Sequence, residues 1–600
     1  MQRCAYRKGF LSILLLTLYA CAPAYPVFIP PAQDNTEIAP SVPTDLPVQS
    51  HAEVTETWAL PIATQSPSPT AQLPTPTRVP LSYWISPEVP ARLLDPAQIP
   101  SSLSRTEGAV DNALTLGLAE RMPGGSVLLK EADYIFALVA PFKTVQDDVT
   151  ASDLKAAWQG SPQGTTDHLT HIAVYEGDYH ALVALLGGAP GGDVISETVL
   201  LLPDGLDNFS EHLSANVWAI VPFERLTPAY KVISLDGLSP LDDGFTQQSY
   251  PIYGKYALYT SEMTAQHFLS NDKDAFIAAL PDTNRDESKL TTLVMTGVTA
   301  LVRATAFQME NKGITYPARD IVDWLKAADI THISNEVSFY EDCPYPDPSY
   351  GGLNFCSHPK YIELFDFIGA DVIELTGNHN NDSFIKYGVD VVPSTLELYA
   401  EHGMVTYAGG TNLVQAMQPA LLDHNGNRLA FIGCNAFGPV AAWATDSSSG
   451  SAPCGDLEWM AAEVDRLKAE GYLVIATFQY YEDYFKSAPQ PMKADFRKMA
   501  EAGAVIVNGS QAHLAKEMEI YNDALIHYGL GNLFFDQMTI EVNGKLITET
   551  RNEFIQRHVF YNGEYISTEL LTAVLEDFAK PRPMTLEERQ AFLEEIFSVR

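Results

Sequence analysis

The stretch from Val507 to Gln537 reads VNGSQAHLAKEMEIYNDALIHYGLGNLFFDQ. The apolar, mostly β-branched residues 504–507 meet a Gly-Ser turn, and His513 lies just beyond that turn. A second apolar segment, residues 524–528, ends in Gly-Leu-Gly-Asn. Polar side chains that directly follow apolar strands are typical of loops at the end of a buried sheet. This stretch therefore predicts two buried strands whose terminal loops present functional side chains.

Similar apolar segments recur through the C-terminal half and alternate with segments of helical periodicity. Strand candidates are residues 291–298, 332–333, 372–375, 429–433, 473–478, 504–507 and 524–528. Helix candidates are residues 318–328, 359–369, 388–402, 457–471 and 493–503. Alternating strands and helices predict a layered α/β domain, and ligands in such folds gather at the carboxyl ends of the strands.

Several residues of the quoted stretch resemble a known signature. Gly509, Gln511, His513, Tyr528, Asn532 and Asp536 resemble the C-terminal motif of the CapA family. This family comprises capsule or poly-γ-glutamate synthesis proteins with a metallophosphoesterase-like fold. The resemblance covers roughly residues 291–537. It implies that residues 289–560 form a metallophosphoesterase-like α/β sandwich.

Three further polar segments follow strand candidates in the order that this family has them. Ser334-Asn335-Glu336 resembles its Asn-Leu-Glu, and the run from Gly377 to Asp382 resembles its Asn-Asn-His-x-x-Asp. Gln479 to Glu482 stands where the family has His-Trp-Gly-x-Glu. A carboxylate beside a carboxamide suits a metal ion or a proton-transfer role. The alternatives are a capping Asn with a solvated Glu, and an Asn-rich turn. An unbroken run of Asn and His after an apolar strand favours a functional loop.

Three positions that the resemblance marks as metal ligands are replaced in this chain. Val298 stands for an Asp, and Gln479 and Gln511 each stand for a His. A dinuclear site needs several charged or imidazole ligands, whereas glutamine oxygen is a weak ligand and valine is none. We therefore expect no two-metal hydrolytic site, and either one divalent metal ion or none as cofactor.

The residues that match the family pattern are assigned three kinds of role. Glu336, His379 and His513 are the candidate catalytic groups, with the histidines as hydrogen-bond donors or acid–base groups. Candidate ligands of a degenerate metal site are Asn335, Glu336, Asn378 and His513. The remaining pocket candidates are Asp382, Gln479, Glu482, Gln511, Tyr528 and Asn532.

The size and charge of the chain limit its partners. A chain of 600 residues is too long for one hydrophobic core, so two or more domains are expected. The formal net charge of −38 argues against nucleic acid as a partner, because phosphate binding needs clustered Lys and Arg. A polyanion such as polyglutamate would need a local basic patch, and the sequence shows none.

The N-terminus has the pattern of a bacterial export signal. Residues 1–20 combine basic residues with an apolar run, and Ala20 precedes Cys21 as in a lipobox. Residues 21–82 are rich in Pro, Thr, Ser and Ala, which predicts an extended tether. We expect a lipoprotein that is anchored through Cys21 on the extracellular face of the cell membrane. A plain secretory signal or an uncleaved anchor is the alternative.

The cysteines beyond the export signal agree with that compartment. Two short-loop disulfides, Cys343–Cys356 and Cys434–Cys454, are the simplest of three possible pairings. A metal site built from these cysteines is the weaker interpretation, because the sequence contains no Cys-x-x-Cys.

Residues 83–263 also alternate strand-like and helix-like segments, with strand candidates at 126–130, 134–140, 199–202 and 217–222 and a helix candidate at 149–159. The segments from Val149 to Leu154 and from Ala219 to Phe223 resemble type 2 periplasmic solute-binding proteins. That fold implies a ligand cleft between two lobes. The alternative is a module without a ligand, used as a spacer or docking domain. Residues 561–600 are expected to form a C-terminal tail.

The resemblance to the CapA family implies a role in the synthesis, anchoring or processing of an envelope polymer such as poly-γ-glutamate. The expected partners are that polymer or its synthase, and the membrane is contacted only through the lipid anchor. Two alternatives stay open: a metal-dependent hydrolase of the metallophosphoesterase-like type, and an extracellular solute-binding or sensor protein. The sequence leaves open whether the protein is an enzyme.

Overall fold

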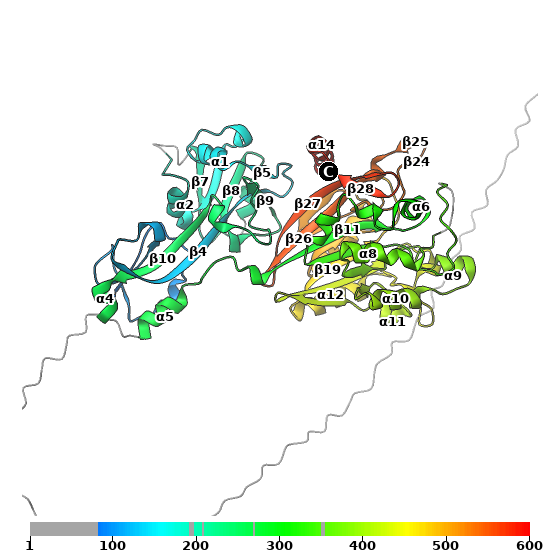
Figure 1. Ribbon diagram of the computed structural model, residues 1–600, viewed down its shortest axis with the longest axis horizontal. Coiled ribbons are helices and arrows are strands. Elements are labelled where there is room, and N and C mark those ends of the chain that lie inside the picture. Colours follow the sequence, from blue (N-terminus) through cyan, green and yellow to red (C-terminus); the bar gives the residue numbers. More distant parts are fainter. Residues whose placement is uncertain (1–81, 191–196, 207–208, 268–270, 350–354, 600) are drawn as a thin grey trace, which may run out of the picture. The chain divides into compact units, whose positions relative to one another are not determined.

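The computed structural model describes residues 82–190, 197–206, 209–267, 271–349 and 355–599. Within these ranges the chain forms two α/β domains, which confirms the predicted fold class (Figure 1). The predicted export signal, Cys21 and nearly all of the predicted linker lie outside the described residues. No helix in the described ranges is both long and apolar enough to cross a membrane.

The N-terminal domain is built on one ten-stranded sheet. Its order is β2-β1-β3-β10-β4-β8-β6-β7, with β9 paired to β4 and β5 paired to β9. The strands are β1 (Ser82–Ile85), β2 (Ser104–Arg105), β3 (Ala113–Leu118), β4 (Ser126–Pro141), β5 (Asp148–Val149), β6 (His171–Tyr175), β7 (Val199–Leu202), β8 (Val217–Pro222), β9 (Tyr230–Leu235) and β10 (Tyr253–Ser261). The helices are α1 (Ala151–Trp158), α2 (Tyr179–Leu185), α4 (Glu262–His267) and α5 (Asn271–Ala279).

The long strand β4 joins the two halves of this sheet. Residues 126–135 pair with β10, and residues 136–139 pair with β8. The predicted strands 126–130 and 134–140 are therefore one element, because residues 131–133 also pair with β10. The predicted end of this domain at residue 263 is too early, since Phe276 and Leu280 pack in the core of the domain.

The C-terminal domain contains two main sheets. The eight-stranded sheet has the order β14-β13-β12-β11-β26-β27-β28, with β23 paired to β11. Its strands are β11 (Leu290–Thr299), β12 (Ile330–Asn335), β13 (Val372–Glu374), β14 (Val405–Tyr407), β23 (Asn532–Phe534), β26 (Asn552–Tyr561), β27 (Glu564–Glu576) and β28 (Lys580–Pro583). The six-stranded sheet has the order β16-β17-β19-β20-β22-β21. Its strands are β16 (Ala420–His424), β17 (Asn427–Asn435), β19 (Leu473–Gln479), β20 (Ala504–Asn508), β21 (Met518–Tyr521) and β22 (Ala524–His527).

Helices pack against these two sheets, and two small strand pairs complete the domain. The helices are α6 (Arg303–Lys312), α7 (Val322–Lys326), α8 (Ile362–Ile368), α9 (Asp382–Tyr387), α10 (Val392–Glu401), α11 (Leu413–Ala416), α12 (Glu458–Ala469), α13 (Gln490–Ala502) and α14 (Leu586–Ser598). The strand pairs are β15 (Gly409–Gly410) with β18 (Gly450–Ser451), and β24 (Ile540–Val542) with β25 (Lys545–Ile547).

Side-chain alternation along the strands creates the layers of the sandwich. Along β19, Val474 and Ala476 pack toward helices α12 and α13, while Ile475 packs between the two sheets. On α12, Met460, Val464 and Leu467 recur at helical spacing and form the buried face. The domain is therefore an α/β/β/α sandwich, as the resemblance implied.

The residues expected to form a C-terminal tail belong to this sandwich. Strands β27 and β28 extend the eight-stranded sheet beyond β26, and α14 follows them (Figure 1). Phe592 and Leu593 of α14 are buried in the core between the sheets. The expectation of a tail at residues 561–600 is wrong, because long antiparallel strands there complete the sheet.

Both predicted disulfides are present. Cys343 is bonded to Cys356, and Cys434 is bonded to Cys454. The second of these closes the loop that follows β17, and this loop supports the candidate site described next.

Candidate functional site

Three loops at the carboxyl ends of strands converge on one carboxylate. Glu336 follows β12, His379 follows β13, and His513 follows β20. Glu336 Oε1 lies 3.7 Å from Nε2 of His379 and 3.9 Å from Nε2 of His513. The carboxylate is 1% exposed and the His513 side chain 8%, whereas the His379 side chain is 25% exposed. We call Glu336, His379 and His513 the Glu336 trio. His379 is the most exposed of the three, so solvent or a ligand reaches it first.

Two partner side chains fix the orientation of the imidazoles. Nδ1 of His379 lies 2.7 Å from Asp382 Oδ2, and Nδ1 of His513 lies 2.8 Å from Asn532 Oδ1. Asn532 Nδ2 in turn donates to the carbonyl oxygens of His513 and Thr550. Both rings are therefore held with Nε2 directed at Glu336.

The tautomers follow from these partners. Because Asp382 and Asn532 Oδ1 can only accept, each ring carries a proton on Nδ1. Neutral rings would then aim two bare Nε2 atoms at the Glu336 carboxylate. Lone pairs facing a carboxylate repel each other, so the cluster favours an additional proton on Nε2 of one ring. Burial alone lowers the pKa of His379, but Glu336 and Asp382 outweigh this and raise the pKa above its ordinary value of 6.5.

An arginine clamped between aromatic rings lies beside the trio. Phe355 stacks on the ring of His379 with centroids 3.7 Å apart, and Phe535 stacks on His513 at 4.9 Å. The guanidinium of Arg303 lies 4.7 Å from the Phe355 centroid and 5.0 Å from that of Phe535. Arg303 forms an ion pair with Asp536, which also accepts from the backbone N–H of Ala304 at 2.9 Å.

Sequence reasoning missed Arg303, Phe355 and Phe535 as site residues. Asp536 was part of the family signature, but its cationic partner was not foreseen. Arg303 directly follows the apolar end of the β11 segment, Ala300 to Val302. A single arginine at such a strand end is a signal that could have singled it out, whereas nothing local marks Phe355.

The predicted residue Glu482 lies at the same edge of the sandwich. It follows β19, and its carboxylate accepts a hydrogen bond from the Tyr484 hydroxyl. Burial by itself raises the pKa of Glu482. Nearby His513, the Tyr484 hydroxyl and His379 have a larger, opposite effect, so the pKa lies below its ordinary range. The site therefore includes a second carboxylate that remains ionised near the imidazoles.

Close backbone contact brings the two loops of the eight-stranded sheet together. Val337 and His379 form an isolated parallel β-bridge. At Gly377 an added Cβ would lie 2.6 Å from Cα and 2.7 Å from the carbonyl oxygen of Glu336, which is closer than real side chains approach. Glycine at position 377 is therefore needed for Glu336 and His379 to be neighbours.

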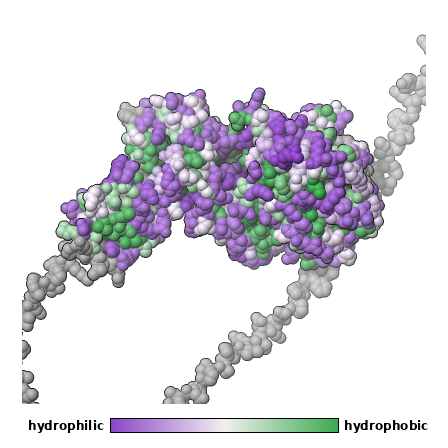
Figure 2. Space-filling model, in the orientation of Figure 1, coloured by the Kyte–Doolittle hydropathy of each residue, from purple (hydrophilic) through white to green (hydrophobic). Residues whose placement is uncertain are grey.

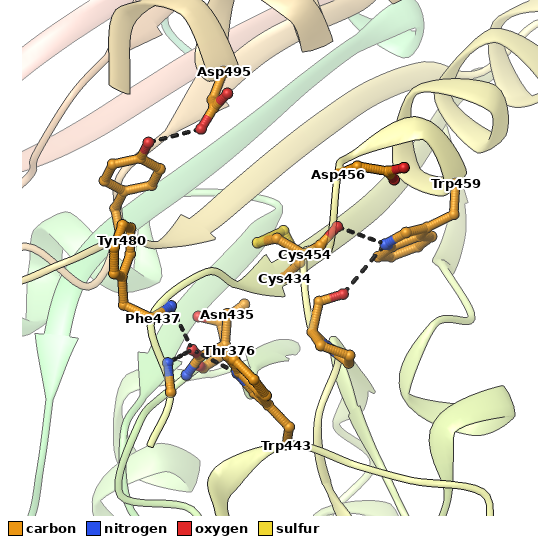
Figure 3. The surroundings of a disulfide bond; sticks show 12 residues. Thr376, Cys434, Asn435, Phe437, Trp443, Cys454, Asp456, Trp459, Tyr480 and Asp495 are labelled. Carbon is orange, nitrogen blue, oxygen red and sulfur yellow. Dashed lines mark hydrogen bonds between the residues drawn. A yellow bond between two sulfur atoms is a disulfide. The ribbon is translucent and has the colours of Figure 1, made fainter. Parts of the chain in front are cut away.

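The disulfide-closed loop after β17 supports the His379 loop from outside. Figure 3 shows Asn435, which is next to Cys434 in the sequence. The Oδ1 atom of Asn435 accepts hydrogen bonds from the backbone N–H of Phe437 and from Trp443 Nε1. Asn435 Nδ2 donates to the carbonyl oxygen of Thr376 at 2.8 Å, just before the His379 loop. Asn381 donates to the carbonyl oxygens of Ala441 and Ser449 within the same closed loop. The disulfide thus restrains a segment that positions His379.

The other predicted site residues divide into two groups. Buried amide oxygens without a hydrogen-bond partner in the described structure belong to Asn335, Asn378, Gln479 and Gln511. Tyr528 does not join the site, contrary to expectation. Its hydroxyl donates to Glu519 at 2.5 Å and its ring packs on Phe496 of α13, so it belongs to the outer helix layer.

A second polar cluster lies between the sheets. Glu374 of β13 accepts from Thr376 Oγ1 at 2.6 Å and from Ser510, and lies 3.6 Å from His332 Nε2. His332 Nε2 also contacts the Tyr407 hydroxyl at 2.8 Å. Burial raises the pKa of Glu374 and lowers the pKa of His332 to about 3. The buried environment therefore disfavours the charged form of both groups.

The donor atoms do not form a ready metal centre. Within the described ranges, no group of three or more His, Cys, Asp and Glu side chains is arranged to hold a metal ion. Val298 is fully buried where the resemblance implies a metal-binding Asp, and its N–H donates to the carbonyl oxygen of Gly531. The residues present do not fit a two-metal site, so no step proposed below runs through a metal.

Comparison with known proteins gives the family of the C-terminal domain. Residues 292–537 match the family model described as bacterial capsule synthesis protein PGA_cap. Over these residues the C-terminal domain is similar to this capsule synthesis family. All three members of the Glu336 trio lie within the matched residues.

Two relatives in the capsule synthesis family come from Bacillus. The chain is 23% identical over 320 residues to the capsule biosynthesis protein CapA of Bacillus anthracis, an alignment that covers 52% of this chain and 75% of the relative. It is 26% identical over 234 residues to the PGA biosynthesis protein CapA of Bacillus subtilis, covering 39% of this chain and 57% of that relative. The alignment thus spans little more than half of the second relative.

Two solved structures resemble parts of this chain. A phosphate transport receptor from Vibrio cholerae has 12% identity and a TM-score of 0.24, covering 28% of this chain and 72% of its own. A 5'-nucleotidase from Staphylococcus aureus has 12% identity and a TM-score of 0.29, covering 51% of this chain and 58% of its own. Neither score reaches 0.5, so these likenesses add no argument about function.

Proposed function

We propose that this protein acts in the cell envelope on a capsule-type polymer such as poly-γ-glutamate, in its synthesis, anchoring or processing. The observation that carries this proposal is the buried Glu336 carboxylate within 4 Å of two oriented imidazoles. The match of residues 292–537 to the capsule synthesis family supports the choice of polymer. The proposal includes lipid anchoring through Cys21, and a site that has lost the metal ligands of a two-metal centre.

The trio is suited to acid–base chemistry on an amide-linked polymer. Cleavage or transfer of an amide needs a base for the attacking nucleophile and an acid for the departing amine. His379, with a raised pKa and 25% exposure, supplies the acid from Nε2. His513, whose Nδ1 proton is held by Asn532, supplies a bare Nε2 as the base. Glu336 stabilises whichever ring is positively charged.

The charges around the trio set the conditions for a polyanionic substrate. Glu336, Asp382 and Glu482 repel carboxylates of the polymer, whereas protonated His379 attracts them. Arg303 is already paired with Asp536. Polymer binding is therefore expected to weaken as the pH rises through the pKa of His379.

Chain-length analysis of defined poly-γ-glutamate tests the proposal. Purified full-length protein is incubated with the polymer, and both bound polymer and product length are measured. We expect Glu336→Gln, His379→Gln and His513→Gln each to lower processing by about 10²- to 10⁴-fold. His402→Gln is the matched control, because His402 pairs with Asp366 on the helical surface of the same domain.

Three results would contradict this reading. Wild-type protein that neither binds nor alters the polymer removes the substrate class. Unchanged processing in all three trio variants removes the acid–base roles. Stoichiometric metal, with activity lost on chelation and restored by the same metal, would support the metal-dependent hydrolase instead.

A second candidate function is solute binding by the N-terminal domain, favoured by a polar cluster in the middle of the long strand β4. The Tyr134 hydroxyl and Asn284 Nδ2 each donate to Glu224 at 2.6 Å. Asp178 is buried, and its Oδ1 has no hydrogen-bond partner in the described structure. Burial and the charge of Glu224 raise the pKa of Asp178 to about 7.

A thermal-shift screen of small solutes on the full chain addresses this second candidate. A stabilising solute whose effect disappears in Asp178→Asn would support it. A stabilisation that persists in that variant, or the lack of any stabilising solute, would remove it.

A further inference from the structure

A groove beside the candidate site has an acidic lining. It holds about 360 Å³ and runs between α10 and the segment from Phe339 to Glu341. Four of its lining residues are exposed carboxylates, and these are Glu341, Asp390, Glu397 and Glu401. The groove lies within the C-terminal domain and shares no lining residue with the Glu336 trio.

The carboxylates of this groove lack a cationic partner. Within the described ranges, no Lys, Arg or His forms an ion pair with any of the four. Glu397 and Glu401 are one turn apart on α10, and like charges at this spacing repel each other. Asp390 accepts hydrogen bonds from Ser449 and from the Val392 N–H, which fixes its carboxylate at the groove. This arrangement is complementary to positive charge supplied from outside the chain.

An exposed apolar strip on α9 and the two residues that follow it borders the groove. The exposed fractions are 54% for Phe384, 56% for Ile385, 37% for Tyr387 and 39% for Val389. Val389 also lines the groove, and the rings of Tyr387 and Tyr340 lie 5.4 Å apart. Figure 2 shows one face of the molecule, on which hydrophilic residues surround several patches of hydrophobic residues. Four large apolar side chains on one short segment therefore depart from the usual composition of a surface.

We propose that the strip and the groove together dock a short segment of a partner protein that carries Lys or Arg beside apolar residues. We call this region the α9–α10 surface, defined by Phe384, Ile385, Tyr387, Val389, Glu341, Asp390, Glu397 and Glu401. The apolar residues of the segment cover the α9 strip, and its basic residues reach the unpaired carboxylates. An anionic polymer is repelled by the same groove, so this surface is distinct from the site that acts on the polymer.

The α9–α10 surface is coupled to the candidate site by one residue. Asp382 is the first residue of α9, and its carboxylate accepts the Nδ1 proton of His379. A segment seated on α9 therefore lies one helical turn from the group that orients His379. The docking itself does not depend on the proposed function.

Binding of a designed probe to the full-length protein tests this surface. The probe is a fluorescein-labelled twelve-residue helical peptide with lysine on one face and leucine on the other. Its binding is measured by fluorescence anisotropy. We expect Glu397→Lys with Glu401→Lys to weaken binding by at least about tenfold. Phe384→Ser with Ile385→Ser is expected to weaken it by at least about fivefold through lost apolar contact.

A matched pair of reversals separates docking from general charge. Asp465→Lys with Glu587→Lys changes the net charge equally on exposed positions of α12 and α14, and is expected to leave the affinity near the wild-type value. The same peptide with Glu in place of Lys should not bind. Crosslinks from a photoreactive leucine position are expected in residues 339–341 and 384–401.

Each of the following results overturns the proposal. The first is that the control reversals weaken binding as much as the groove reversals do. The second is that the groove reversals leave binding unchanged. The third is that the glutamate peptide binds as tightly as the lysine peptide. Crosslinks confined to another part of the chain do the same. None of these measurements uses polymer turnover, so failure here is distinguishable from failure of the proposed function.

Discussion

Two clusters of the C-terminal domain each pair a glutamate with histidine, but they differ in their surroundings. At the strand ends, Glu336 lies 3.7 Å from His379, and between the sheets Glu374 lies 3.6 Å from His332. His379 is 25% exposed, whereas Glu374 and His332 are fully buried. Burial disfavours the charged forms of Glu374 and His332, whereas Glu336 and Asp382 favour the charged form of His379. Solvent contact thus decides which cluster can exchange protons.

The comparison also separates two uses of a buried carboxyl group. Glu374 is surrounded by hydroxyl donors from both sheets, including Thr376 and Ser510, so it links the layers of the sandwich. Glu336 has one oxygen with no hydrogen-bond partner in the described structure and faces the loops that carry the histidines. The inner cluster links the two sheets, whereas the outer cluster is the one to which we assign the proposed chemistry.

The largest expected difference is in polymer processing. Glu336→Gln should lower the rate by about 10²- to 10⁴-fold, because the amide holds no charge opposite the imidazolium. Glu374→Gln should leave the rate near the wild-type value, since Glu374 lies between the sheets and the amide oxygen that replaces its carboxylate oxygen still accepts. Both rates are measured in parallel under the same conditions. Equal losses in the two variants would remove the functional distinction between the clusters.

Stability should show the opposite ranking. Glu374→Leu is expected to lower the free energy of unfolding by about 2–4 kcal/mol, because the hydroxyls of Thr376 and Ser510 lose their acceptor in a buried layer. Glu374→Gln should lose less, since its amide oxygen still accepts. Urea unfolding followed by tryptophan fluorescence measures both. A leucine variant as stable as wild type would contradict the linking role.

Histidine titration compares the clusters directly. The raised pKa of His379 means that its protonated form adds stability fully below pH 6.5, and this stability is lost as the pH rises through the folded-state pKa. His332 has a lowered pKa, so its contribution is present above pH 6.5 and is lost as the pH falls toward about 3.

Nuclear magnetic resonance of labelled imidazoles tests these signs. His379 should titrate above pH 6.5 in wild-type protein, and Glu336→Gln should lower its midpoint. The signals of His332 should stay constant at neutral and mildly acidic pH in both proteins. A His379 midpoint that is unaffected by Glu336→Gln would show that the carboxylate does not hold the charge.

The smallest expected effect concerns a third buried carboxyl, Glu553 on β26. It is fully buried, neither oxygen has a hydrogen-bond partner in the described structure, and burial raises its pKa far above the ordinary range. Glu553→Leu should therefore raise the free energy of unfolding by about 1 kcal/mol, the reverse of Glu374→Leu. Urea midpoints of the two leucine variants provide the test, and a loss of stability in Glu553→Leu would reveal an undetected partner.

Periodicity predicted most elements of the sandwich but not their limits. The segment 457–471 became α12 and 493–503 became α13, because each has an apolar face at helical spacing. The expectation for residues 561–600 failed, since a strand such as β27 gains its partners only when the sheet exists. The end of the N-terminal domain at residue 263 was misplaced for a similar reason, because burial of Phe276 depends on packing rather than on local sequence.

The sequence by itself determined that Glu336, His379 and His513 follow strands, and that Val298, Gln479 and Gln511 interrupt the metal-binding pattern. Apolar alternation marks the strands, because strand pairing needs it. The resemblance to the CapA family marks the three replaced positions, and their side chains lack the donor types that metal binding needs. Only the tertiary structure decided that Arg303, Phe355 and Phe535 flank the histidines, and that Tyr528 faces the helix layer instead. Side chains from distant loops meet only after both sheets have stacked, and that packing leaves no mark in the local sequence.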